Sequence, residues 1–258
     1  MTVALDLRGR RALVTGAGQG VGAAVVALLA EAGASVAVND LVADRAELQA
    51  VRVRDAGGEA VAAPFDVTDF EQVTDAVARL GGVDILVNNA GNAGGDSWPG
   101  MVPFAETAPA DWSPFLAVNL LGVMHCVRAS LPAMIEGGWG RVVTIVSDAS
   151  RVGEPMMAAY AAAKAGAAGL MRSVAKEVGR HGVTANSIAL GTMRTPLTEA
   201  VWAGADEQQV AARLRGYAIR RPGQPDDVAA LVGYLVSPAA SWLTGQTIPL
   251  NGGYSLSL

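Results

Sequence analysis

Short apolar runs of strand length alternate with alanine-rich stretches of helical length along the whole chain, and this alternation limits the possible fold more than any other feature. The apolar runs are continuous, which is typical of parallel strands whose two faces are both covered by helices. The strand-length runs are 11–16, 35–40, 61–66, 83–91, 141–147, 183–190 and 247–253, and the helical stretches are 20–32, 44–56, 69–80, 111–136, 157–179 and 225–236. The pattern predicts one doubly wound α/β domain over residues 1–258, with a seven-stranded parallel sheet and helices on both faces.

The composition argues against several classes of protein. Apolar residues make up 51% of the 258 residues and charged residues 17%, so we expect an ordered core. A formal net charge of −5 without long Lys/Arg runs argues against a nucleic-acid partner. Cys126 is the single cysteine, and His125 and His181 lie far apart, so the sequence predicts neither an internal disulfide nor a metal site.

The first residues and the apolar tracts favour a protein that is neither exported nor inserted in a membrane. The segment 1–16 contains Asp6 and lacks the apolar centre of a secretory signal. The longest apolar tract, 21–38, is interrupted by Glu31 and Gly33, so we expect a buried helix followed by a strand instead of a membrane span. We therefore expect a cytoplasmic protein without a membrane partner.

A glycine-rich loop joins the first strand to the first helix. The sequence TGAGQGVG at 15–22 allows a tight turn and lets a pyrophosphate approach the amides at the helix N-terminus, where the helix dipole favours an anion. In this strand–loop–helix context the loop predicts a Rossmann-type dinucleotide site, and a merely structural turn is the alternative. The cofactor contacts expected here are Gly16, Gly18, Gln19, Gly20, Val21 and Gly22.

The end of the second strand indicates which dinucleotide is bound. Asp40 lies 18 residues past Gly22, where a carboxylate accepts hydrogen bonds from ribose hydroxyls and repels a 2′-phosphate. The nearest arginine, Arg45, lies beyond it in the next helix, and the loop carries the neutral Gln19. NAD is therefore favoured over NADP. The alternative is that Asp40 only caps the helix that begins near Asp44.

Two further strand ends carry groups to the same edge of the predicted sheet. Residues 66 and 67 follow the third apolar run, and the sequence NNAG at 88–91 ends the fourth. The carboxyl ends of parallel strands form the edge at which open α/β sheets bind ligands, so we expect contacts with adenine and with the nicotinamide ribose. The residues expected to make them are Asp66, Val67, Asn89, Ala90 and Gly91.

A tyrosine and a lysine stand out in the stretch AAYAAAKAGAAG at 158–169. The chain has 17 arginines but only two lysines, and one of them, Lys164, follows Tyr160 by one helical turn. A nearby ammonium and a positive nicotinamide ring both favour the phenolate, which otherwise forms only near pH 10. Tyr160 is therefore a candidate proton carrier. The alternative is a chance pair on a surface helix, as the placement of Lys176 illustrates.

The motifs together resemble the short-chain dehydrogenase/reductase family over essentially the whole chain. Ser147 ends the fifth strand thirteen residues before Tyr160, and Asn119 lies inside the helical stretch 111–136. The resemblance rests on TGAGQGVG, NNAG, the tetrad Asn119, Ser147, Tyr160 and Lys164, the sequence RPGQPDDVA at 221–229, and LTGQTIPLNGG at 243–253. It implies a nicotinamide-dependent oxidoreductase.

The resemblance also implies a role for each member of the tetrad. Tyr160 would exchange a proton with the substrate oxygen, and Ser147 would hydrogen-bond that oxygen. Lys164 would bind the nicotinamide ribose and lower the pKa of Tyr160, and Asn119 would hold a water that relays protons to solvent. Taken singly, Ser147 could be a strand-end turn residue and Asn119 a residue that caps or kinks its helix.

Two positions depart from the pattern of the family. Leu190 precedes Gly191 where the family commonly has Pro-Gly, and Asn251 stands where it commonly has the Asp of Asp-Gly-Gly. The absence of proline is expected to alter how the next residues meet the cofactor. The cofactor contacts expected in that segment are Gly191, Met193 and Thr195.

A long polar insertion follows the sixth strand. We expect residues 191–216 to form a substrate lid, because long insertions in compact α/β domains often cover a site. The alternative is a pair of exposed helices that do not move. Met156, Met157, Trp98 and Trp202 are candidates to line an apolar pocket, although such residues more often fill a core.

The stretch that carries Tyr160 is small and apolar nearly all round, so something besides the sheet is expected to cover it. The family resemblance implies a homotetramer in which the stretches 111–136 and 157–179 pack between subunits.

The leading interpretation is an NAD(H)-dependent oxidoreductase that transfers a hydride between nicotinamide and a secondary alcohol or ketone. The sequence SDASRVG at 147–153 resembles relatives that act on cyclic hydroxyacyl-CoA thioesters, and the whole pattern resembles 3-oxoacyl-thioester reductases, so a thioester is one candidate substrate. A small cyclic or steroid-like ketone is another. Reduction of a carbon–carbon double bond is disfavoured, because relatives with that chemistry usually space Tyr and Lys more widely. The remaining alternative is a non-catalytic nucleotide-sensing protein, and such proteins generally lose the Tyr and Lys that this chain keeps.

Overall fold

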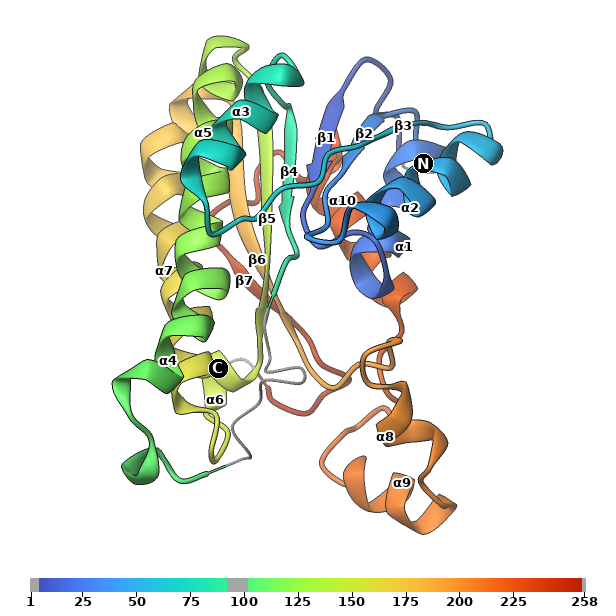
Figure 1. Ribbon diagram of the computed structural model, residues 1–258, viewed down its shortest axis with the longest axis vertical. Coiled ribbons are helices and arrows are strands. Elements are labelled where there is room, and N and C mark those ends of the chain that lie inside the picture. Colours follow the sequence, from blue (N-terminus) through green and yellow to red (C-terminus); the bar gives the residue numbers. More distant parts are fainter. Residues whose placement is uncertain (1–4, 92–101, 257–258) are drawn as a thin grey trace.

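Seven parallel strands form one sheet with the order β3-β2-β1-β4-β5-β6-β7 in the computed structural model, which describes residues 5–91 and 102–256 (Figure 1). The strands are β1 (Arg11–Val14), β2 (Ser35–Val38), β3 (Glu59–Ala62), β4 (Ile85–Asn88), β5 (Gly140–Ser147), β6 (Val183–Leu190) and β7 (Thr247–Leu250). All six neighbouring pairs are parallel, which confirms the predicted fold class.

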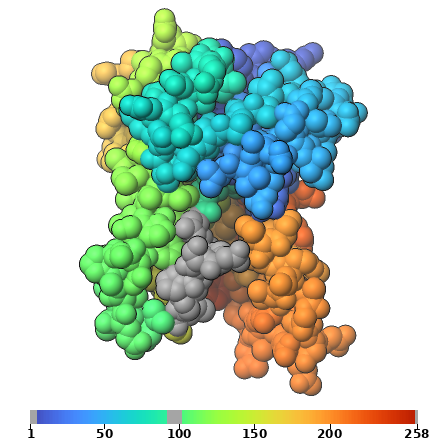
Figure 2. All heavy atoms as spheres, in the orientation of Figure 1, coloured from blue at the N-terminus to red at the C-terminus, as the bar shows by residue number. Residues whose placement is uncertain are grey.

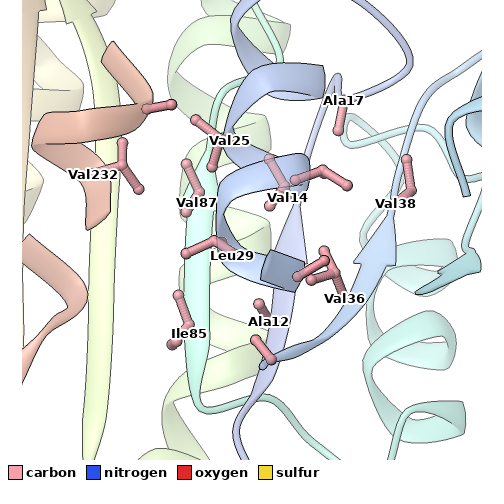
Figure 3. Packing of buried hydrophobic residues seen from close by; sticks show 14 of the residues in the cluster. Ala12, Val14, Ala17, Val25, Leu29, Val36, Val38, Ile85, Val87 and Val232 are labelled. Carbon is pink, nitrogen blue, oxygen red and sulfur yellow. The ribbon is translucent and has the colours of Figure 1, made fainter. Parts of the chain in front are cut away.

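Helices cover both faces of the sheet. One layer contains α1 (Gly20–Glu31), α2 (Ala43–Asp55) and α10 (Pro225–Val236), and the other contains α3 (Phe70–Arg79), α5 (Gly122–Glu136) and α7 (Ala158–Val178) (Figure 1). Each layer buries its own apolar cluster against the strands. In Figure 3, Val25 and Leu29 of α1 pack toward Val14 and Val87 of β1 and β4. The strands are apolar on both faces because both faces are buried.

The third strand lies earlier in the chain than the sequence pattern indicates. The apolar run 61–66 was the expected strand, but β3 starts at Glu59, which pairs with Ser35, and its last paired residue is Ala62. The Ala63 amide still donates to the Val38 carbonyl at 2.8 Å, but Pro64 has no amide hydrogen to donate to a ladder, so the residues that follow Ala63 leave the sheet. The predicted bounds of this strand were therefore wrong, although its existence and order were right.

The expected helix at 111–136 is not continuous. Its residues belong to α4 (Pro109–Leu116), a π-helical turn η3 (Ala117–Leu121) and α5. A π turn adds one residue to a helical turn and re-aims the side chains around it, and such turns occur frequently at functional sites. The side chain re-aimed here is that of Asn119.

Several short elements complete the described chain. They are η2 (Phe104–Glu106), α6 (Ala149–Val152), η4 (Gly179–His181), α8 (Glu199–Ala203), α9 (Glu207–Arg213) and η5 (Pro238–Ala240). Helices α8 and α9 lie in the insertion 191–216 and extend beyond the carboxyl ends of the strands (Figure 1).

One stretch is long and apolar enough to cross a membrane by length and composition alone. Pro109–Glu136 spans 28 residues, and 33% of its most apolar window is buried inside the protein. Pro114, Pro132 and the π turn interrupt it, and α5 packs on β4 and β5. We interpret it as a sheet-covering helix with one exposed apolar side. The tract 21–38 forms α1 and β2, as predicted.

Candidate active site

A cleft of about 810 Å³ runs along the carboxyl ends of the strands. It lies at the point between β1 and β4 where the strand order reverses, which is where open α/β sheets bind ligands. Figure 2 shows the green segment around α4 and the orange segment around α8 and α9 on opposite sides of the lower half of the molecule. The predicted site residues that line the cleft are Gly16, Gln19, Gly20, Val21, Asp40, Asp66, Val67, Asn89, Ala90, Gly91, Asn119, Ser147, Tyr160, Lys164, Gly191, Met193 and Thr195.

Gly18 and Gly22 were predicted as cofactor contacts but do not line the cleft. Both positions have no room for a side chain. A Cβ atom at Gly18 would lie 2.5 Å from the Cβ of Arg45, and one at Gly22 would lie 2.6 Å from the carbonyl oxygen of Gly16. Gly16 and Gly20 differ, because their φ angles of 60° and 58° are in the left-handed region that side chains disfavour. The loop can therefore turn tightly and still let α1 pack close to β1 and β4.

The N-terminus of α1 fits a pyrophosphate. Gln19, at the N-cap, makes no side-chain capping bond, and the first turn carries no acidic residue. In α3, by comparison, the Asp69 carboxylate accepts bonds from the amides of Glu71 and Gln72. The helix dipole and the amides at the start of α1 thus face the cleft without a protein carboxylate, which favours a bound anion.

Asp40 serves the loop as well as the cleft. Its Oδ2 accepts a hydrogen bond from the Gly18 amide at 3.1 Å, and its Oδ1 accepts one from the Val42 amide at 3.0 Å, just before α2 begins. The binding and capping interpretations are therefore not exclusive. Arg45 also lines the cleft, so this cation is closer to the site than its place in the sequence indicates.

Two polar residues to which the sequence assigned no role hold the strand ends together. The Thr15 hydroxyl accepts hydrogen bonds from the amides of Asn89 and Ala90, which ties the end of β1 to the end of β4. Asn39 donates to the carbonyls of Ala63 and Phe65 and accepts from the Gly16 amide. Both residues adjoin predicted contacts, and that adjacency was the only available signal.

Other cleft residues were not predicted as contacts, although Leu190 and Thr192 adjoin the expected departure from Pro-Gly, because most are apolar and only the fold brings them together. They are Leu41, Phe65, Val118, Ile145, Val146, Leu190, Thr192, Pro196, Leu197 and Thr198. The last four, with Gly191, Met193 and Thr195, come from the first part of the insertion 191–216.

Asn119 is fully buried in the π turn. Its Nδ2 donates to the carbonyl of Phe115 at 3.0 Å. A Cβ atom built on Gly91 would lie 3.3 Å from Asn119 Oδ1 and 3.4 Å from Lys164 Nζ. The end of β4, the π turn and α7 therefore converge on one point, and only glycine leaves room for a ligand or a water there.

Lys164 is also buried, with 4% of its surface exposed. Its Nζ donates to the carbonyl of Ile145 at 2.9 Å and lies 5.9 Å from the centre of the Tyr160 ring. Burial disfavours the ammonium and lowers the pKa of Lys164 to about 8. A lysine in this state exchanges protons near neutral pH, which an arginine in its place would not do.

Tyr160 lies at the mouth of the cleft beside Ser147. Burial raises the pKa of Tyr160, and the hydrogen bond with the Ser147 side chain acts in the opposite direction. The pKa is thus shifted upward in this state, whereas the sequence interpretation had Lys164 lowering it. The reason is that Lys164 donates to a backbone carbonyl, while the phenolate would lose water.

The residues expected around an apolar pocket separate in the structure. Met156 and Met157 line a pocket beside Tyr160. Trp202 is buried in the insertion, where its Nε1 donates to the carbonyl of Met193 at 3.2 Å. Trp98 lies outside the described residues. Within 5–91 and 102–256, no group of three His, Cys, Asp or Glu side chains is placed to hold a metal ion.

Comparison with known proteins agrees with this geometry. A family model described as "Enoyl-(Acyl carrier protein) reductase" matches residues 16–255. The chain is 37% identical to the 7α-hydroxysteroid dehydrogenase of Escherichia coli K12, over 96% of this chain and 95% of the relative. It is 35% identical to a 3-oxoacyl-[acyl-carrier-protein] reductase of Vibrio cholerae, over 96% and 98% of the two chains. The protein belongs to the short-chain dehydrogenase/reductase family.

Solved structures resemble the whole fold. A gluconate 5-dehydrogenase from Burkholderia cenocepacia in complex with NADP and tartrate has a TM-score of 0.89 and 35% identity, and 99% of each chain is covered. A 7α-hydroxysteroid dehydrogenase in complex with NADH and 7-oxoglycochenodeoxycholic acid has a TM-score of 0.87 and 35% identity, with 98% of this chain and 97% of the other covered. Oxidoreductases with either nicotinamide cofactor therefore share this architecture.

We predict that Lys164→Met stabilises the cofactor-free protein at pH 7. The folded-state pKa of about 8 lies below the model-peptide value of 10.5, so below pH 8 the folded protein carries a buried charge that the unfolded chain keeps in water. Removing it should raise the free energy of unfolding by up to about 3 kcal/mol, and the gain should shrink between pH 8 and 10.5. Urea unfolding at several pH values measures this.

The matched control is Lys176→Met, because the other lysine of the chain lies exposed on the same helix. That substitution should change the free energy of unfolding by less than about 0.5 kcal/mol at any of these pH values. A Lys164→Met protein that is less stable than the wild type at pH 7 would contradict the stated cost of burying the ammonium.

Proposed function

We propose that this protein is an NAD(H)-dependent dehydrogenase/reductase that interconverts a secondary alcohol and a ketone. The observation that carries the proposal is the convergence of the tetrad from three separate elements, η3, β5 and α7, on the cleft that also holds the glycine-rich loop. The activities of two relatives, a hydroxysteroid dehydrogenase and an oxoacyl reductase, support the same type of reaction.

The tetrad would act directly on the substrate oxygen. When bound, the nicotinamide supplies or accepts the hydride at the substrate carbon. Ser147 and Tyr160 already lie within hydrogen-bonding distance of each other, so an oxygen placed between them would contact both hydroxyls. In reduction Tyr160 donates its proton to that oxygen, and in oxidation it removes the proton while Ser147 keeps its hydrogen bond.

Lys164 and Asn119 would connect this proton to solvent. Lys164 presents an amine of lowered pKa that can hold ribose hydroxyls and exchange protons with them. Asn119 Oδ1 lies on the same side of Gly91 as Lys164 Nζ, so a water held between them would extend the relay. Tyr160 then recovers its proton state without contacting bulk water.

NAD is the proposed cofactor because Asp40 places a carboxylate in the part of the cleft that the adenosine ribose would occupy. NADP is the second candidate, favoured by the position of Arg45 in the same cleft and by the NADP bound to the gluconate 5-dehydrogenase. The choice between the two cofactors depends on the 2′-phosphate of NADP, which the carboxylate of Asp40 would repel and the guanidinium of Arg45 would attract.

We infer one catalytic domain over the whole chain, with the insertion 191–216 as a lid whose first residues line the cleft. A homotetramer is proposed because α4, η3 and α5 leave the apolar side chains of Leu116, Leu121 and Met124 exposed on one side of the sheet-covering layer. A second copy of the chain could cover this apolar surface. We also propose that the protein acts in the cytoplasm.

Substitution of Tyr160 tests the reaction. Tyr160→Phe removes only the hydroxyl, so ketone reduction should fall by about 10²-fold or more while NADH still binds. NADH oxidation with a panel of ketones and oxoacyl thioesters measures the first effect, and cofactor fluorescence measures the second. Tyr234→Phe, on the outer side of α10, is the control. Equal turnover by the Tyr160→Phe variant and the wild type would refute the role of Tyr160 in proton transfer. The protein would then use another proton donor or would not be an enzyme.

Substitution of Asp40 tests the cofactor. Asp40→Asn removes the charge and also one of the two acceptors for the Gly18 and Val42 amides. The loss of charge should raise kcat/KM with NADPH relative to NADH by about tenfold through the unmasked attraction of Arg45. Arg45→Leu in the same background should cancel the gain. A wild-type protein that already prefers NADPH would refute the role of Asp40 and leave that of Tyr160 untouched.

A further inference from the structure

A second, smaller pocket adjoins Tyr160. Phe104, Trp112 and Phe115 line one side of it, from η2 and α4, and Met156 and Met157 line the other, just before α7. Tyr160 borders both this pocket and the large cleft. A substrate whose oxygen meets Tyr160 could therefore place a neighbouring group between the aromatic side and the two methionines.

The lining of this pocket is aromatic, and its polar groups are already paired. Phe104 stacks on Trp112 with ring centres 5.3 Å apart, and Phe115 meets the Tyr160 ring edge-on at 6.3 Å. The Thr107 hydroxyl accepts from Trp112 Nε1 and donates to the Phe104 carbonyl, both at 2.8 Å. The pocket thus offers ring contacts, and a substrate rich in hydroxyls would lose hydrogen bonds on entering it.

The charges around the pocket disfavour an anionic group. Its one charged lining residue within the described chain is Asp111, whose carboxylate accepts from the Ala108 amide at 2.8 Å. Arg151, in the same loop as the methionines, is paired with Asp148 at 2.7 Å, and Arg194 is paired with Glu199 at 2.5 Å.

The backbone at Met156 is strained. Its φ angle of 64° lies in the left-handed region, and within the described chain it is the one residue other than glycine found there. Its side chain is 47% exposed, so burial does not explain the conformation. The turn after Pro155 explains the conformation: the Met157 amide donates to the Glu154 carbonyl at 3.2 Å, which closes a turn with Met156 at its third position. The turn holds the Met156 side chain against the pocket.

We propose that this pocket is a ring subsite, which receives the edge of an uncharged alicyclic or aromatic ring attached to the reacting carbon. Its volume of about 40 Å³ admits only a few atoms of such a ring, and the rest of the ring would lie in the large cleft that Tyr160 also borders. The proposal rests on the proposed function and narrows it: the substrate is a neutral cyclic or aryl ketone, or the corresponding alcohol, and not a polyhydroxy acid or a ketone with a carboxylate on its ring.

Two ketones with the same ring test the ring subsite. The enzyme with NADH should reduce 4-methylcyclohexanone with a kcat/KM at least about tenfold above that for 4-oxocyclohexanecarboxylate, because only the second brings a charge toward Asp111. Trp112→Ala should raise KM for the methyl ketone by about tenfold through lost ring contact. Trp242→Ala is the control, since that side chain is fully exposed. Calorimetric titration of the Tyr160→Phe variant measures ring binding without turnover.

The possible outcomes distinguish a failure of the ring subsite from a failure of the proposed dehydrogenase/reductase function. Preference for the carboxylate, or an unchanged KM in Trp112→Ala, overturns the ring subsite while the reaction stands. If the enzyme reduces only linear ketones, the ring subsite is likewise overturned while the reaction stands. Failure to reduce any ketone overturns the proposed function and the subsite with it.

An independent set of contacts links the C-terminal segment 251–255 to the residue after Ser147. Asn251 Nδ2 donates to Asp148 Oδ2 at 2.8 Å, and Arg151 pairs with Asp148 Oδ1 at 2.7 Å. Arg151 also donates to the Ser255 hydroxyl at 2.9 Å. Asp148 is 3% exposed and Asn251 is 7% exposed, so the carboxylate depends on these donors instead of water.

The same segment reaches the start of the insertion 191–216. The Tyr254 hydroxyl donates to Glu154 at 2.8 Å, and the Tyr254 ring stacks on Tyr217 with centres 4.8 Å apart. The Tyr217 hydroxyl in turn accepts from the Thr192 amide at 3.1 Å. The C-terminal segment therefore holds both the loop after Ser147 and the residues that line the cleft after β6.

We infer that Asp148 and Asn251 are positioning residues that keep Ser147 and the Thr192 segment in register across the cleft. The inference also explains the departure of Asn251 from the family pattern. A carboxylate at this position would face the buried carboxylate of Asp148, so this chain needs a neutral donor there.

A charge exchange tests the positioning pair. Asn251→Asp should lower kcat by about tenfold or more by placing two carboxylates together, and the double variant Asp148→Asn/Asn251→Asp should recover most of the loss because one donor and one acceptor are restored. The Kd for NADH should rise by less than about threefold in the single variant, because neither residue lines the cleft and the pair reaches the cofactor only through the segment that starts at Gly191.

Tyr254→Phe serves as the milder variant, because it removes one hydrogen bond and keeps the ring on Tyr217. Its kcat should fall by less than that of Asn251→Asp. A loss of apparent kcat that matches an equal loss in the number of NADH sites titrated would indicate a general loss of folded protein and overturn the positioning role. Failure of the double variant to recover activity beyond the single variant would overturn it as well.

Discussion

The pairing of β1 with β4 is the contact on which the whole site depends. Ala12 pairs with Ile85 and Val14 with Val87, and the strand order reverses at this point, so the loops after the two strands diverge and leave the cleft between them. Thr15 continues the ladder with side-chain hydrogen bonds to the amides after β4. Pairing of β4 with β5, and of β5 with β6, then brings Ser147 and Leu190 to the same edge.

Burial sets the chemistry of the tetrad. The same desolvation raises the pKa of Tyr160 and lowers that of Lys164, so burial shifts each group toward its neutral form in the protein without its cofactor. A positive nicotinamide ring would reverse the balance for the phenol. The tyrosine would thus become a proton carrier only when the cofactor is present, while Lys164, held by the Ile145 carbonyl, keeps its place.

The two sides of the cleft are built by different physical means. The cofactor side consists of backbone turns, glycines and strand-end carboxylates, which any sheet of this topology can present. The opposite side consists of aromatic rings, methionines and a C-terminal segment tied down by Asp148 and Glu154. Selectivity for the substrate is expected on that second side, where the side chains are particular to this chain.

The sequence by itself determined the fold class, the order of elements and many of the residues that line the cleft at the strand ends, because periodicity and local motifs such as TGAGQGVG and NNAG act over a few residues. It placed the third strand two residues late, since the ladder with β2 and the missing amide of Pro64 decide where that strand runs. It also missed the π turn at Asn119 and placed Arg45 too far from the site. Only the tertiary structure decided the ring subsite and the Asp148–Asn251 pair, whose members lie 103 positions apart. Contacts of that kind depend on which side chains the packed sheet brings together, and no local pattern encodes them.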